Sequence, residues 1–146
     1  MRFEADVWLP ALREEVFGFF SDAMNLQALT PSWLHIDVIT PQPISIAVGT
    51  RLDYRLRLRG IPVRWQSEIT VWDPPNRFVD EQRRGPYRRW VHTHRFIDER
   101  GGTRMIDEVD FEVPGGSLVT WFVMRDVRKI FAFRRTVLQR RFSPSA

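Results

Sequence analysis

The stretch FVDEQRRGPYRRWVHTHRF, from Phe78 to Phe96, decides the fold. A Gly-Pro pair stands in its middle, and side chains alternate on both arms, which is the pattern of a β-hairpin with a loop of a few residues. Side chains of a strand point alternately to the two faces of a sheet, so each arm presents one set of residues on a common face. These sets are Phe78, Asp80 and Gln82 on the first arm, and Trp90, His92, His94 and Phe96 on the second.

The aromatic members predict that both sets face the interior. The opposite face of the hairpin is mainly charged, with Arg77, Glu81, Arg83, Arg89 and Arg95, and is typical of a solvated surface. A row of polar side chains is therefore predicted inside an apolar interior, close enough for cross-strand hydrogen bonds. The predicted pairs are Phe78 with Phe96, Asp80 with His94, and Gln82 with His92.

Before the hairpin, the sequence predicts one strand, two helices and further strands. Arg2 to Leu9 alternates as a strand, and a helix follows Pro10, a residue that favours the first turn. A second short helix is expected from Asp22 to Leu29. Strands are then expected at His35–Ile39, at Thr50–Arg59 with Tyr54 inward, and at Pro62–Trp72 with Val63, Trp65, Ser67, Ile69 and Val71 inward.

After the hairpin, a last strand and a long helix are predicted. The strand Thr103–Val113 presents Met105, Asp107, Val109 and Phe111 on one face, and pairing Phe96 with Met105 places His94 opposite Asp107. Ser117 is a suitable N-cap for a helix that runs to about Arg141. Its predicted apolar stripe is Val119, Val123, Val127, Ile130, Phe131, Val137 and Leu138.

This order of elements resembles the START-like helix-grip superfamily, which includes plant pathogenesis-related allergens, lipid-transfer domains and the polyketide cyclase/dehydratase group. The segment GPYRRWVHTHRF, from Gly85 to Phe96, looks like the matching hairpin of bacterial ligand-binding members. The resemblance implies an α+β fold, in which a curved antiparallel sheet of about seven strands surrounds a long C-terminal helix and two short helices follow strand 1. It also implies one domain over residues 1–146 and a cavity for an apolar or amphipathic molecule.

Composition limits the classes of function. The chain has no cysteine, which excludes disulfides and thiolate chemistry. Its longest apolar run, Leu118 to Met124, is far shorter than the ~20 residues of a membrane span, so a cytoplasmic protein is expected. The net charge of +4 permits attraction to anionic polymers, but charge alone specifies no partner, and no specific nucleic-acid partner is predicted.

Three interpretations of the polar row remain open. The row can satisfy itself as a structural strut, anchor the polar end of a bound molecule, or take part in metal binding or catalysis. The two aspartates predict that His94 is partly protonated near neutral pH. His92-Thr93-His94 beside carboxylates suits zinc or iron, but an ion-paired His94 could not coordinate, so neither a metal nor another cofactor is predicted.

The function predicted from the sequence is the binding of a small hydrophobic or amphipathic molecule, such as a lipid, an isoprenoid or a polyketide. One alternative is a cyclase or dehydratase with His92 or His94 as general acid or base. Another is a basic interaction module formed by the Arg-rich end of the helix, at Arg134, Arg135, Arg140 and Arg141. The predicted ligand-binding residues are Tyr54, Trp65, Asp80, Gln82, Trp90, His92, His94, Asp107, Phe111, Val123 and Val127.

Overall fold

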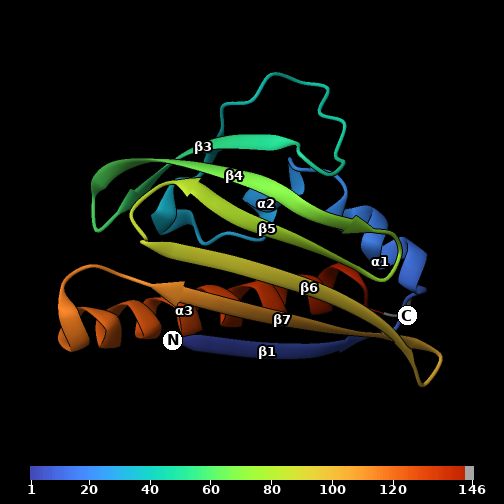
Figure 1. Cartoon of the computed structure of the whole chain (residues 1–146). Coiled ribbons are helices and arrows are strands. Elements are labelled where there is room, and N and C mark those ends of the chain that lie inside the picture. The colour runs from blue at the N-terminus through green and yellow to red at the C-terminus, as the bar shows by residue number, and fades with distance from the viewer. Residues whose placement is uncertain (144–146) are drawn as a thin grey trace.

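A computed structural model describes residues 1–143 and places seven antiparallel strands in one curved sheet (Figure 1). The order across the sheet is β1-β7-β6-β5-β4-β3-β2, so strands β2 to β7 each lie beside their neighbours in the chain. Only β1 lies apart from β2, at the far edge beside β7. The strands are β1 (Arg2–Leu9), β2 (Asp37–Val38), β3 (Arg51–Leu58), β4 (Ile61–Asp73), β5 (Arg77–Arg84), β6 (Arg89–Glu99) and β7 (Gly102–Glu112).

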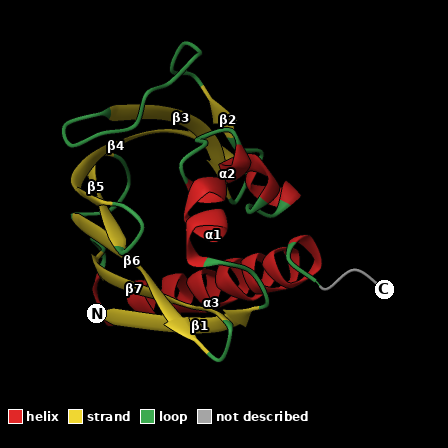
Figure 2. Ribbon diagram, turned by 90° about the vertical axis from the view of Figure 1, so that its right-hand side faces the viewer, coloured by secondary structure: helices red, strands yellow, loops and turns green. Residues whose placement is uncertain are grey.

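The helices lie on one side of this sheet, which curves around them (Figure 2). They are α1 (Arg13–Phe20), α2 (Asn25–Ala28), a short 3₁₀ helix η1 (Ser32–Leu34) and α3 (Gly116–Arg141). The predicted α+β helix-grip architecture is therefore confirmed. Two elements are shorter than predicted: α2 has four residues, and β2 has two, with His35 excluded from it as the left-handed C-cap of η1, at a φ of 47°.

The long helix α3 packs against the sheet through one side. Its buried residues recur every three or four positions and are Met124, Val127, Phe131, Arg134 and Leu138. Val119, predicted to belong to the buried stripe, is instead 40% exposed. The predicted N-cap is also wrong, because Gly115, with a φ of 109°, occupies that position and Ser117 lies inside the first turn. Among residues 1–143, no helix combines the length and the apolar character needed to cross a membrane.

The register of the central hairpin differs from the prediction by two residues. Phe78 pairs with His94, and Asp80 pairs with His92. The cause lies in the loop, where the Gln82 side-chain amide donates to the Tyr87 carbonyl at 2.7 Å and accepts from the Tyr87 N–H at 3.1 Å. Gln82 therefore pairs with Ser67 of β4 but has no cross-strand partner in β6. The predicted pairs of β6 with β7 are confirmed, since Phe96 pairs with Met105 and His94 with Asp107.

A β-bulge in β4 changes which residues face the helices. The register shifts between Ile69 and Val71, so that Trp72 pairs with Phe78 and packs against Phe17 at a ring-centroid distance of 5.0 Å. Val71, predicted to face inward, pairs with Val79 on the other face. One extra residue in a strand reverses the alternation beyond it. Strict alternation therefore predicted the inner face correctly only as far as Ile69.

Gly102, at the start of β7, is required by a close approach of β1. A Cβ atom at this position would lie 2.4 Å from the Leu9 carbonyl oxygen, which is backbone and cannot rotate away. We expect Gly102→Ala to lower the free energy of unfolding by ~1–3 kcal/mol, the usual cost of overpacking. Gly18→Ala in α1 is the matched control: nothing lies within 4 Å of its Cβ, and alanine favours a helix. Urea denaturation should show opposite signs for the two variants, and an unchanged Gly102→Ala would contradict the packing argument.

Candidate functional site

Five polar side chains from four elements meet between the sheet and α3. Asp80 comes from β5, His92 and His94 from β6, Asp107 from β7 and Arg134 from α3. All except Asp80 are buried, with exposed fractions between 4% and 8%. We call these residues, Asp80, His92, His94, Asp107 and Arg134, the polar cluster. Because ionisable groups are seldom buried without partners, their mutual contacts determine what the cluster can do.

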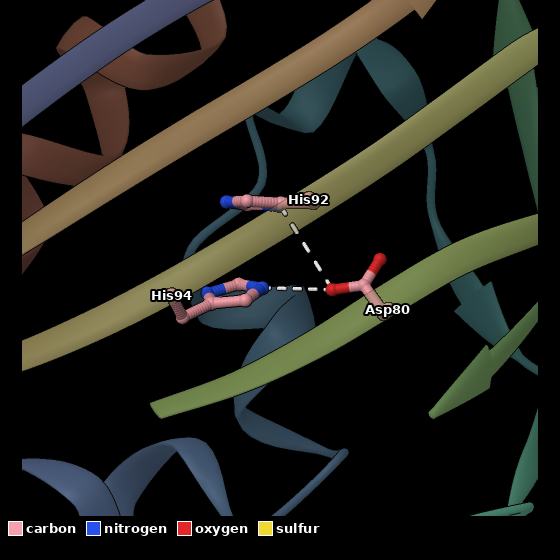
Figure 3. Close-up of side chains that lie close together, drawn as sticks. All are labelled: Asp80, His92 and His94. Atoms are coloured by element: carbon pink, nitrogen blue, oxygen red, sulfur yellow. Dashed lines mark hydrogen bonds and ion pairs between the residues drawn. The ribbon is translucent and has the colours of Figure 1, made fainter. Parts of the chain in front are cut away.

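Two short hydrogen bonds join the histidines to the aspartates. His94 Nε2 lies 2.7 Å from Asp80 Oδ2, and His92 Nε2 lies 2.7 Å from Asp107 Oδ1. Both bonds run diagonally across the sheet, because the direct cross-strand partner of Asp80 is His92 and that of His94 is Asp107. Figure 3 shows both imidazoles beside Asp80, with His92 Nδ1 at 3.9 Å from Asp80 Oδ2. Asp80 is thus shared by the two rings.

Three rings form a stack along the inner face. The rings of Phe78 and His94 are 3.9 Å apart between centroids and inclined by 12°, and those of His94 and His92 are 3.6 Å apart and inclined by 25°. His94 is therefore enclosed by a phenyl ring on one side and an imidazole on the other. This environment disfavours a charge on His94, since it offers little solvation.

Burial lowers the pKa of His94 to about 4, and electrostatic repulsion by the adjacent His92 imidazole acts in the same direction. The hydrogen bond to Asp80 raises the pKa but does not compensate. His94 is therefore neutral near pH 7, contrary to the prediction from the sequence. The two flanking carboxylates were identified correctly, but the cost of desolvation is larger than their attraction.

Both aspartates are ionised. Burial alone would raise the pKa of Asp80, but the hydrogen bond from His94 and the electrostatic interaction with His92 lower it below its usual value. Burial acts in the same way on Asp107, where the charge of Arg134 and the hydrogen bond from His92 hold the pKa well below its usual range. The cluster thus contains two carboxylates that can accept hydrogen bonds but cannot donate them.

Arg134 is the member of the cluster that sequence reasoning misplaced. The sequence predicts it on a basic surface, but it is 8% exposed, and its Nη2 lies 3.6 Å from Asp107 Oδ1. Its guanidinium carbon also lies 4.9 Å from the centroid of the Phe131 ring. The one available signal was the helical spacing, because Arg134 follows Phe131 by three residues and Val127 by seven. An arginine on the buried side of a helix needs a carboxylate partner, and Asp107 supplies it.

A cavity of about 170 Å³ lies beside the polar cluster. Its wall is mainly apolar and aromatic, and a smaller cavity of about 70 Å³ shares Asp80, His94 and Arg134 with it. Within the cluster, Asp80 is the most accessible group: 20% of its side chain is exposed, against 5% for each histidine. Burial and the charge of Asp80 raise the pKa of Tyr54, so the phenol in this wall stays protonated.

Comparisons with known proteins identify the family of this chain. Residues 9–135 match the model of the family described as "Polyketide cyclase / dehydrase and lipid transport". The chain belongs to this family. Both roles in that description concern hydrophobic or amphipathic small molecules, so the binding of such molecules is supported at the level of the family. No curated protein matches the sequence significantly.

Solved structures share the fold of this member of the polyketide cyclase and lipid transport family. TTHA0849 from Thermus thermophilus is 22% identical with a TM-score of 0.66, over 95% of this chain and 92% of that one. CV1439 from Chromobacterium violaceum is 14% identical with a TM-score of 0.75, over 99% and 98%. A START superfamily protein from Mycobacterium smegmatis is 11% identical with a TM-score of 0.69, over 95% and 97%. The predicted START-like resemblance is therefore confirmed for the fold.

The structure brings together most of the residues predicted to contact a ligand. The cavity wall contains Tyr54, Trp65, Asp80, Trp90, His92, His94 and Val127, together with Arg134 and Tyr87, which the prediction did not include. The other four lie elsewhere. Gln82 holds the β5–β6 loop, Asp107 lies behind His92, and Phe111 and Val123 belong to the core between β7 and α3. For Asp107 and Phe111, the alternation of β7 predicts the inner face of the sheet but not the distance from the cavity.

Asp80, His92 and His94 are also the one described group with the composition of a metal site, and their ligand atoms lie within 4.8 Å of one another. The stacking of the two imidazoles works against coordination. A metal ion must lie near the plane of each ring that binds it, and two rings inclined by only 25° with centroids 3.6 Å apart do not share such a point. Metal binding would therefore require the rings to separate and the His94–Asp80 hydrogen bond to break.

Proposed function

We propose that this protein binds a small, largely apolar molecule that carries a hydroxyl group, and that Asp80 accepts a hydrogen bond from this hydroxyl. The observation that supports the proposal is the accessibility of Asp80 in the apolar cavity. An ionised carboxylate accepts hydrogen bonds and repels anions, so the ligand should bring a donor to it. His94, behind Asp80, keeps the carboxylate in place.

The size of the cavity supports a small ligand. About 170 Å³ is less than the ~300–1,000 Å³ typical of pockets for drug-sized molecules. Trp65 and Trp90, whose ring centroids are 5.4 Å apart, form an aromatic part of the wall. A compact aromatic or isoprenoid alcohol has the required shape and polarity.

Binding is favoured over proton-transfer catalysis by the state of the candidate bases. An efficient general base has a pKa near the working pH. His94 has a pKa of about 4, and the pKa of Asp80 is lowered as well, so both are weak bases near pH 7. In addition, both candidate imidazoles already have a carboxylate partner: His94 Nε2 is hydrogen-bonded to Asp80, and His92 Nε2 to Asp107. The cluster is therefore better suited to holding a hydroxyl than to removing a proton.

Asp80→Asn tests the proposal with 2-naphthol and naphthalene, two ligands that differ only in a hydroxyl group. A hydrogen bond to a charged acceptor contributes ~1.5–3 kcal/mol, so wild type should bind 2-naphthol roughly 10- to 100-fold more tightly than naphthalene. Asp80→Asn should remove most of this difference and leave the affinity for naphthalene almost unchanged. Isothermal titration calorimetry measures both ligands.

Glu81→Gln is the matched control, because it removes a carboxylate from the next residue of β5, on the opposite face of the sheet. It should bind both ligands as wild type does. Equal affinities of wild type for 2-naphthol and naphthalene would show that Asp80 does not contact the ligand. A loss of naphthalene binding in Asp80→Asn would indicate a collapsed cavity, which a thermal melt would reveal.

A further inference from the structure

The outward side of α3 carries exposed aromatic and basic side chains at helical spacing. They recur every three or four residues along the side of the helix that faces away from its buried residues. No other helix or strand of the described chain covers them. We call this set the α3 outer stripe; it consists of Leu118, Trp121, Phe122 and Phe133, which are 68%, 57%, 41% and 38% exposed, and of the exposed Arg125 and Lys129 between them.

The charge of the protein is concentrated on this helix. From Gly116 to Arg141 there are seven basic residues and one acidic residue, a net charge of +6, whereas the whole chain has +4. The single acidic residue, Asp126, is paired with Arg59 of the β3–β4 turn, with 3.2 Å between Nη2 and Oδ2. The outer stripe therefore carries positive charge with no carboxylate of its own helix left to neutralise it.

Two aromatic residues of the stripe, Trp121 and Phe122, lie near the N-terminal end of the helix. The rings of Trp121 and Phe122 are 4.9 Å apart between centroids, and the Arg59 guanidinium lies 5.9 Å from the Phe122 ring. Figure 1 shows the first turns of α3 projecting past the ends of β1 and β7. Helices that lie in a membrane interface combine Trp, Phe and Leu with Lys and Arg, which is the composition of this stripe.

We propose that the α3 outer stripe docks on an anionic lipid bilayer. Trp121 and Phe122 would enter the interfacial region, while Arg125 and Lys129 would contact the acidic headgroups. A second copy of the chain fits less well, since a two-fold symmetric contact would bring two strongly positive helices together. The inference goes beyond the proposed function and does not depend on the identity of the ligand. Val127, on the buried side of α3, lines the cavity, so docking would place α3 between the bilayer and the cavity.

Sedimentation with vesicles tests the proposal. The purified protein is mixed with vesicles of phosphatidylcholine alone, or of phosphatidylcholine with 30% phosphatidylglycerol. We expect at least tenfold stronger partitioning onto the anionic vesicles, and a marked loss at 0.5 M NaCl because salt screens exposed charges. Trp121→Ser/Phe122→Ser and Arg125→Glu/Lys129→Glu should each lower the partition coefficient at least tenfold.

Control variants remove exposed basic or apolar side chains elsewhere on the surface. Arg55→Glu/Arg57→Glu changes two exposed arginines of β3, and Val48→Ser removes a side chain that is 65% exposed. Both should bind vesicles within about twofold of wild type. If Arg55→Glu/Arg57→Glu weakens binding as much as Arg125→Glu/Lys129→Glu, the attraction comes from overall charge and the docking surface is refuted. Equal binding to both kinds of vesicle, or stripe-dependent binding to tRNA without binding to vesicles, would also refute it. Circular dichroism verifies that each variant is folded.

Discussion

Asp107→Ala should lower the free energy of unfolding by ~3–5 kcal/mol, the usual result of removing one partner of a buried charged pair. Asp107 is 4% exposed, accepts a hydrogen bond from His92 at 2.7 Å, and lies 3.6 Å from the Arg134 guanidinium. Without it, Arg134 is a buried cation with no carboxylate within ion-pair distance in the described chain. Urea denaturation at pH 7 measures the loss.

Two variants distinguish this mechanism from a general effect of truncation. Asp110→Ala removes a carboxylate from β7 that lies outside the cluster, and it should change the free energy of unfolding by less than ~0.5 kcal/mol. Arg134→Met added to Asp107→Ala removes the uncompensated cation and should restore part of the lost stability. If the double variant is no more stable than Asp107→Ala, the unpaired charge of Arg134 is not the cause.

Stability should fall steeply as the pH is lowered from 6.5 towards 4. Burial lowers the pKa of His94 from 6.5 to about 4, so in this window the unfolded chain takes up a proton that the folded protein does not bind. Folding stability then rises with pH, by ~1.4 kcal/mol per pH unit for one such group and about 3 kcal/mol over the window. The lowered pKa of Asp107 adds a further loss below its ordinary value of 3.8. Denaturant midpoints measured between pH 7.5 and 4.5 test this dependence.

The source of the pH dependence can be assigned with two histidine variants. His94→Phe removes the titrating ring and keeps an aromatic group against Phe78, so its stability should change little between pH 7 and 5. His35→Asn replaces an exposed histidine and suits the left-handed backbone at that position, so it should keep the slope of wild type. A wild-type stability that does not change between pH 7 and 5 would mean that His94 is not buried in its neutral form.

The sequence alone was sufficient to predict the architecture and the part of the site that lies on the sheet. Alternation in Thr50–Arg59 and Thr103–Val113, the turn residues between the strands and the helical spacing after Pro114 predicted the order of elements and the pairing of β6 with β7. They also predicted that Asp80, His92 and His94 share an inner face. These features depend on short-range periodicity, which one sequence contains in full.

The remaining features depend on contacts that periodicity does not encode. The register of β5 with β6 is set by the two hydrogen bonds between Gln82 and Tyr87, and the inner face of β4 changes at its bulge. Arg134 is buried because of the orientation of α3 about its own axis, which turns this side of the helix towards Asp107 of β7. The protonation of His94 depends on the stack with Phe78 and His92, because neighbouring charges alone would predict the opposite state.

The two hydrogen bonds between the Gln82 side chain and the Tyr87 backbone affect how a ligand would enter and leave the cavity. Tyr87 lines one side of the cavity, and two hydrogen bonds fix its backbone. Leu26 and Thr30 line another part of the wall, in and just after the four-residue helix α2, which has no buried residue. The opening that admits a ligand should therefore occur at α2. Amide hydrogen exchange should be faster there than in the β5–β6 loop, and the rate of that local opening should limit how quickly a ligand leaves.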